Sequence, residues 1–106
     1  MDDFSLYQSI TPTVHIYLKD LKGRYLWAND AQIKSAGFAS RHEIVGLTDI
    51  HSKLPWREQG EHLMTIDKEV IDKAHQIICY EQATSADNIL RKVLTKKSPG
   101  LINQVY

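Results

Sequence analysis

The sequence predicts an α+β domain in which helices cover one face of a single antiparallel sheet. Three observations predict this class: strand-like segments lie at both ends of the chain, helical periodicity is confined to the middle, and Gly or Pro marks the boundaries. A chain of 106 residues has the usual size of one domain and can bury one modest core.

The composition excludes several classes of protein. Thirteen Lys and Arg residues balance thirteen Asp and Glu residues, so no basic surplus favours nucleic acid or a membrane surface. Cys79 is the single cysteine, which excludes an internal disulfide. No signal peptide is recognisable, and no apolar run approaches the roughly 20 residues of a membrane span. We therefore expect a soluble, cytoplasmic domain.

The first predicted elements are a short helix and a hairpin. Residues 4–10 place apolar side chains at mixed helical spacings, and Pro12 ends that run. Residues 14–19 and 24–28 are rich in β-branched and aromatic side chains, which favour strands. The polar turn between them contains Gly23, which can adopt positive φ.

The middle of the chain is predicted to be helical. Asn29 is a candidate N-cap for a short helix that stops at Gly37. Residues 40–43 follow the S-x-x-E pattern of a capping box. A longer helix is expected over residues 57–74, where one apolar stripe has helical spacing. The stripe consists of Leu63, Ile66, Val70 and Ala74.

The C-terminal third is predicted to form strands. Residues 76–83 and 89–97 have strand character, and the polar residues 84–88 form the turn between them. Pro99-Gly100 breaks the second strand, and residues 101–106 begin another. The expected order is β-β-α-α-(α)-α-β-β-β.

This order and several motifs resemble a PAS domain. The matching segments are "YLKDLKGRYLWAN", "AGFASRHEIVGLTD", "LPW" followed by "IDKEVIDKA", and "LTKKSP". The resemblance implies a five-stranded antiparallel sheet with helices on one face, in the order ββααα(α)βββ. It makes residues 1–12 an N-terminal helical cap and residues 13–106 the sensor domain. "SADN" replaces the usual Asp-Gly turn, and the last strand stops at Tyr106, so we expect that strand to be truncated.

The resemblance also implies a function. PAS domains are sensory and dimerisation modules of bacterial signal-transduction proteins. The expected role is the input domain of a sensor histidine kinase in a two-component system, with the effector outside this chain. The alternatives are the input domain of a LuxR-type helix-turn-helix transcription regulator or a diguanylate cyclase, or a purely structural dimerisation module. The expected partners are a second copy and a small-molecule ligand, with no nucleic acid or membrane bound by this domain.

Strand alternation gives the predicted hairpin two apolar faces. One face holds Tyr17, Leu26 and Ala28, and the resemblance places it inward. The other face would form an outer patch of the kind that marks interaction sites. Its cover would be the N-terminal helix or a second copy. The interface candidates are Leu6, Ile10, Ile16, Leu18, Tyr25 and Trp27.

The inward residues suggest a pocket between sheet and helices. The alternative for the same residues is plain core packing, because apolar stripes at these periods usually form a core. The pocket candidates are Tyr17, Leu26, Ala28, Ile33, Leu63, Ile66, Val70, Cys79 and Val93.

Two lysines are expected at the rim of this pocket. In the resembled fold, Lys19 and Lys97 point toward the helix side of the sheet, and a lysine rarely stays buried unless it is paired. The hypothesis is that one of them holds Asp49 or Asp67, or else an anionic ligand. The salt bridge is the favoured version.

Cofactors and catalysis find little support in the sequence. The five histidines lack metal-ligand spacing. His62 lies where haem-binding PAS domains place their iron ligand, but its surroundings do not resemble theirs, so haem is not expected. Nothing matches the flavin motif Asn-Cys-Arg-Phe-Leu-Gln, and Cys79 is interpreted as a small buried hydrophobe. No nucleophile turn or phosphate-binding glycine loop is present, so an enzyme is not expected either.

Overall fold

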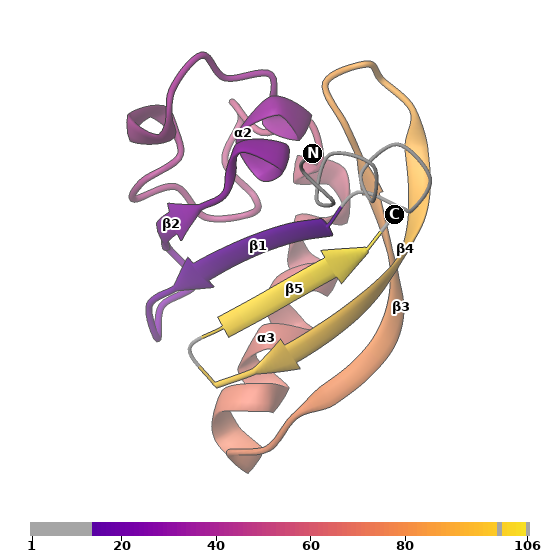
Figure 1. Cartoon of the computed structure of the whole chain (residues 1–106). Coiled ribbons are helices and arrows are strands. Elements are labelled where there is room, and N and C mark those ends of the chain that lie inside the picture. Colours follow the sequence, from indigo (N-terminus) through magenta and orange to yellow (C-terminus); the bar gives the residue numbers. More distant parts are fainter. Residues whose placement is uncertain (1–13, 100, 106) are drawn as a thin grey trace, which may run out of the picture.

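The structure, a computed structural model, describes residues 14–99 and the backbone of residues 101–105 (Figure 1). The predicted N-terminal cap, with Leu6 and Ile10, lies outside the described residues. The strands are β1 (Val14–Lys19), β2 (Tyr25–Ala28), β3 (Ile77–Thr84), β4 (Leu90–Ser98) and β5 (Leu101–Val105). They pair antiparallel in the order β2-β1-β5-β4-β3.

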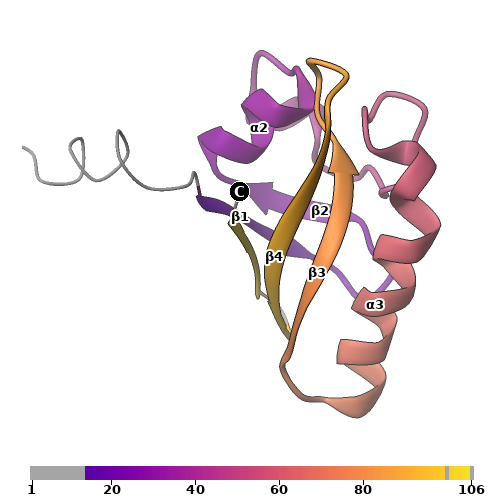
Figure 2. The same cartoon turned by 90° about the vertical axis from the view of Figure 1, so that its right-hand side faces the viewer.

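The segment between β2 and β3 is helical, as predicted. It contains the α-helices α2 (Asp30–Ala36) and α3 (Gly60–Lys73) and the single 3-10 turns η1 (Arg41–Glu43) and η2 (Arg57–Gln59). Figure 2 shows α3 lying along one side of the sheet. The α+β class is therefore confirmed.

Local sequence signals account for the ends of these helices. Asn29 Oδ1 accepts a hydrogen bond from Gln32 N at 3.1 Å, and Gly37 ends α2 in the left-handed region with φ 79°. Glu43 Oε2 accepts from Ser40 N at 3.0 Å, which closes the predicted capping box. These caps fix α2 and η1 beside the β1–β2 end of the sheet.

The hairpin contains a bulge that overturns part of the predicted facing. Leu18 is paired with Trp27 and Lys19 with Tyr25, so Leu26 is an extra residue in β2. Alternation is therefore broken: Tyr25 and Ala28 are buried, whereas Leu26 and Trp27 are exposed. The prediction that Leu26 lies inward and Tyr25 outward was wrong for this reason.

The core lies between the sheet and the helices. The largest side chains in it are aromatic, and the Tyr17 and Tyr25 rings lie 5.3 Å apart between centroids. The ring of Trp56 packs edge-on against Tyr25 at 6.3 Å. The core cluster comprises Tyr17, Tyr25, Ala28, Ile33, Ala36, Ile44, Leu54, Trp56, Leu63 and Ala83.

Gly60 lets the start of α3 approach the preceding loop closely. A Cβ on Gly60 would lie 2.5 Å from the backbone oxygen of Asp49, which no relaxed structure allows. The absence of a side chain therefore positions Asp49 against α3.

We expect Gly60→Ala to lower the free energy of unfolding by about 1–3 kcal/mol, the usual cost of overpacking a tight contact. Chemical denaturation measures this change. Glu61→Ala, at the exposed neighbouring position, is the control and should change stability little. Equal stability of Gly60→Ala and the parent chain would contradict the close approach.

Candidate functional site

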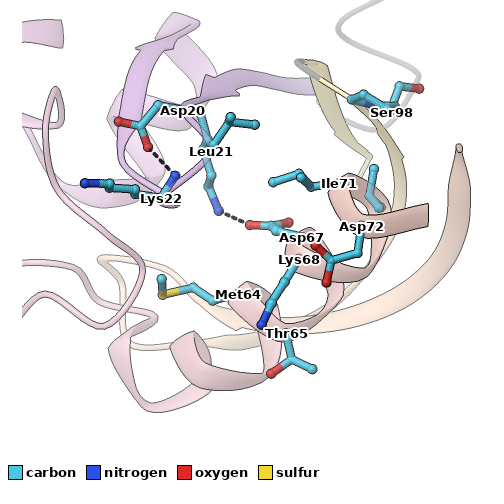
Figure 3. A pocket seen from close by; sticks show the side chains of 14 residues that line it. Asp20, Leu21, Lys22, Met64, Thr65, Asp67, Lys68, Ile71, Asp72 and Ser98 are labelled. Carbon is cyan, nitrogen blue, oxygen red and sulfur yellow. Dashed lines mark hydrogen bonds and ion pairs between the residues drawn. The ribbon is translucent and has the colours of Figure 1, made fainter. Parts of the chain in front are cut away.

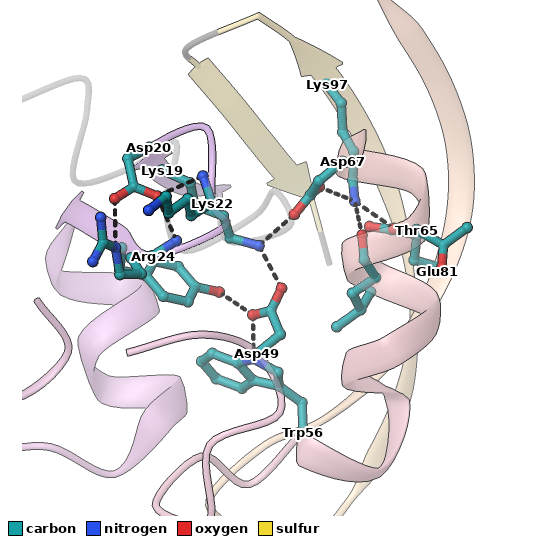
Figure 4. Close-up of polar contacts among 12 residues, drawn as sticks. Lys19, Asp20, Lys22, Arg24, Asp49, Trp56, Thr65, Asp67, Glu81 and Lys97 are labelled. Carbon is teal, nitrogen blue, oxygen red and sulfur yellow. Dashed lines mark hydrogen bonds and ion pairs between the residues drawn. The ribbon is translucent and has the colours of Figure 1, made fainter. Parts of the chain in front are cut away.

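Two lysines and three carboxylates form a buried charge network between the sheet and α3 (Figure 4). Lys19, at the end of β1, is ion-paired with Asp49, and its Nζ lies 2.6 Å from Asp67 Oδ2. Lys97 Nζ, on β4, lies 2.6 Å from both Asp67 Oδ1 and Glu81 Oε2. Asp67 therefore joins the two lysines. We call these five residues the buried network.

Asp49 is held by three other elements of the fold. Its Oδ1 accepts from the Tyr25 hydroxyl at 2.7 Å and from Trp56 Nε1 at 2.8 Å, while Oδ2 faces Lys19. The carboxylate is 1% exposed. Because each oxygen has a donor, the buried charge is well compensated.

The charges of the network shift the pKa values of its members. Burial alone would lower the pKa of Lys19, but Asp49 and Asp67 outweigh it and raise that pKa. Burial would raise the pKa of Asp67, but Lys19 and Lys97 outweigh it and lower the value. Burial, with Asp49 nearby, raises the pKa of Tyr25 well above its ordinary range. Lys19 and Asp67 are therefore ionised at neutral pH, beside the neutral phenol of Tyr25.

A pocket of about 370 Å³ opens next to this network (Figure 3). It lies between the β1–β2 turn, one side of α3 and the end of β4. Lys19 and Asp67 belong to its wall, so any occupant would touch the network directly. The apolar part of the remaining wall comes from Leu21, Met64, Val70, Ile71 and Pro99. Its polar and charged part comes from Asp20, Lys22, Thr65, Lys68, Asp72 and Ser98.

The structure distributes the predicted pocket residues over several environments. Val70 lines the pocket, and Ile66 and Cys79 are partly buried. Leu26 is exposed because of the bulge. The remaining candidates fill the interior, as the core-packing alternative expected: Tyr17, Ala28, Ile33, Leu63 and Val93.

The predicted rim charges do come together. Lys19 holds both Asp49 and Asp67, and Lys97 holds Asp67, so the expected salt bridge is present. The roles of Glu81 and Trp56 in this site were not predicted from the sequence. An acidic residue at an inward position of a predicted strand was the available signal for Glu81.

The predicted interface residues lie on or near the outer face. Ile16 and Leu18 are partly buried and Trp27 is exposed. Tyr25 is removed from this set by the bulge. His62 is exposed on the first turn of α3. No helix in the described part of the chain is both long and apolar enough to cross a bilayer.

The fold was compared with known proteins. A scan of protein-family models and a search of curated proteins gave no match. Among solved structures, the Vibrio cholerae VqmA–ligand–DNA complex has a TM-score of 0.75 at 18% identity, covering 98% of this chain and 49% of that one. The VqmA dimer without target DNA, described as a LuxR-type receptor, has a TM-score of 0.77 at 19% identity. The match covers 98% of this chain and 50% of that one. The chain thus spans about half the length of the VqmA chains.

Isolated sensory domains are also similar. A domain of a sensory box sensor histidine kinase/response regulator from Geobacter sulfurreducens has a TM-score of 0.62 at 16% identity, covering 97% of this chain and 91% of that one. A PAS domain from Colwellia psychrerythraea has a TM-score of 0.62 at 12% identity, covering 99% of this chain and 96% of that one. The chain therefore has the PAS fold.

We expect Asp67→Asn to lower the free energy of unfolding at pH 7 by about 3–5 kcal/mol, because it leaves two buried lysines undercompensated. The lowered pKa of Asp67 stabilises the fold above about pH 4, the unfolded value, and this contribution is lost as the pH falls through the folded value. The acid-induced loss of stability should therefore be smaller in Asp67→Asn than in the parent chain.

Denaturant unfolding between pH 7 and pH 2 measures both effects. Asp72→Asn, at an exposed position on the same helix, is the matched control and should behave as the parent chain does. Identical pH profiles for Asp67→Asn and the parent chain would contradict the role of the network.

Proposed function

We propose that this chain is the sensory PAS module of a longer signalling protein. In this proposal a small molecule binds the pocket beside the β1–β2 turn and shifts the buried network between two arrangements. The observation that carries it is the shared wall: Lys19 and Asp67 belong to both the pocket and the network.

The size and chemistry of the pocket suit a small ligand. Its volume of about 370 Å³ lies at the lower end of the range of small-molecule sites. Its apolar wall, from Leu21 and Ile71 among others, fits a compact ligand body, and the charged groups of Lys19 and Asp67 offer polar partners. Because the network connects β1, β3, β4 and α3, a change at the pocket would reach the sheet.

The effector in the proposed protein lies outside this chain. The input domain of a sensor histidine kinase is the role expected from sequence, and the similar Geobacter sulfurreducens domain supports it. The higher TM-scores of VqmA support the alternative, a LuxR-type transcription regulator. In either case the chain itself is proposed to sense and relay without catalysing a reaction.

Native mass spectrometry of the purified chain tests ligand binding. We expect the parent chain to carry a mass above that of the polypeptide and Ile71→Trp to lose it, because the larger side chain fills the pocket. Lys73→Trp, on the same helix outside the pocket wall, should keep the extra mass. Bare polypeptide in all three would contradict a retained ligand, and retention by Ile71→Trp would move the ligand to another site.

The outer face of the sheet supports dimerisation as a second candidate function. Trp27 and Leu94 are exposed there, and Ile16 and Leu18 are partly buried. In the sheet register, β5 pairs with both β1 and β4, so the outward-facing residues of β1 and β4 lie on the same face of one sheet. Exposed apolar surface of this kind is typical of an interaction site.

We expect the parent chain to be dimeric and Leu94→Glu to be monomeric, since the new carboxylate would be buried against apolar partners. Size-exclusion chromatography with light scattering measures this. Lys53→Glu, at an exposed position of the loop between η1 and η2, is the control and should remain dimeric. A monomeric parent chain at high concentration would contradict dimerisation.

A further inference from the structure

The terminal strand β3 presents an open edge. Across its eight residues, β3 is paired with β4 and with no other strand of the described chain. Figure 2 shows it as the outermost strand, next to α3. Ser85 N donates to Ile89 O at 3.1 Å, toward the neighbouring strand, so the amide of Thr84 must face away from β4.

One contact confirms this direction. Thr84 N donates to Gln59 Oε1 at 3.0 Å, so a side-chain amide occupies the place of a further strand's carbonyl. Every second residue of a strand directs its backbone N–H and C=O groups toward the same side. The N–H and C=O groups of Ile78, Tyr80 and Gln82 therefore also point out of the sheet, along the free edge.

A groove runs beside these groups. It encloses about 500 Å³ between the first turns of the α3 region and the middle of β3. Glu58, Gln59 and His62 line its helix side, and Tyr80, Glu81 and Gln82 line its strand side. Lys92 of β4 completes the lining, with its Nζ 4.6 Å from the centroid of the Tyr80 ring. A strand next to a helix in this way is the arrangement in which domains add an extended peptide to a sheet edge.

Apart from the inward-facing charge of Glu81, this edge lacks the features that usually block pairing. β3 contains no proline, lysine or bulge, and its register with β4 is continuous. Ile78 is 60% and Tyr80 is 65% exposed on the outer side. The opposite edge strand, β2, has only four residues and is bulged.

We propose that the edge of β3 binds an extended peptide strand of a partner protein, lying in the groove beside α3. An extended backbone alternates donors and acceptors at the spacing of the edge groups of Ile78, Tyr80 and Gln82. At Thr84, the side-chain oxygen of Gln59 already accepts one such edge hydrogen bond. Apolar side chains of the peptide contact Ile78 and Tyr80. The alternate basic side chains face Glu58, which is exposed and forms no ion pair among the described residues.

The probe is the peptide Ac-VKVKVK-NH2, titrated into the isotope-labelled chain and followed by NMR at assigned amides. We expect the largest shifts and the strongest new protection from exchange at the amides of Ile78, Tyr80 and Gln82. The same peptide with N-methylated valines cannot pair with the edge and should bind at least about fivefold more weakly, the effect of one lost hydrogen bond.

Variants at Gln82 separate backbone pairing from side-chain contact. Gln82→Pro removes an amide that faces away from β4, so the β3–β4 ladder stays intact, and binding should weaken at least about fivefold. Gln82→Thr keeps the amide and changes only the side-chain contact, so it should bind the peptide more tightly than Gln82→Pro does. The amide spectrum of each variant reports whether the fold is retained.

Three outcomes would overturn the proposal. One is the absence of shifts at the three edge amides at millimolar peptide, and another is equal binding of the N-methylated peptide. The third is concentration-dependent protection of the edge amides without peptide, lost in Gln82→Pro, which would make a second copy of the chain the occupant. None of these results depends on the pocket beside the β1–β2 turn.

Discussion

The carboxylate of Asp67, shared between Lys19 and Lys97, is the interaction on which the fold of this domain most depends. Each lysine comes from a strand, and neither ammonium group could remain in the interior without a carboxylate. Because Asp67 lies on α3, its ion pairs with both lysines hold the helix against the sheet. The charges therefore fix the position of α3, while the apolar core supplies most of the buried surface.

The same network makes the pocket part of the protein's framework. An occupant that contacts Lys19 or Asp67 competes with ion pairs that hold β1, α3 and β4 together. The free energy of these ion pairs would therefore depend on whether the pocket is occupied. Binding in the pocket would in this way be coupled to the position of β4. Tyr25 and Trp56 extend this coupling to the loop that carries Asp49.

Much of the fold followed from local sequence signals. The caps at Asn29 and Gly37 were predictable because capping depends on residues a few positions apart. The pairing of Lys19 with an acidic partner was predictable because a lysine at an inward strand position needs a counter-charge. The resemblance to PAS domains supplied the arrangement of the sheet, which no local signal contains.

The remaining errors have one physical origin, which is tertiary geometry. The positions of Leu26 and Tyr25 could not be inferred from alternation, because a bulge is set by pairing between strands. The pocket was expected within the core, but it lies where Leu21 and the side of α3 meet, residues that sequence alone assigns to turn and solvent. Most residues of the predicted apolar stripes fill the core, whereas Val70 lines the pocket.

The bulge at Leu26 also has an evolutionary consequence. The extra residue leaves Tyr25 opposite Lys19, with its hydroxyl on Asp49, and adds the exposed side chain of Leu26 beside it. Loss of the Leu26 codon would restore regular alternation, with Trp27 outward and Tyr25 still inward. The length of β2 can therefore change by one residue at this position without removing the tyrosine–aspartate contact.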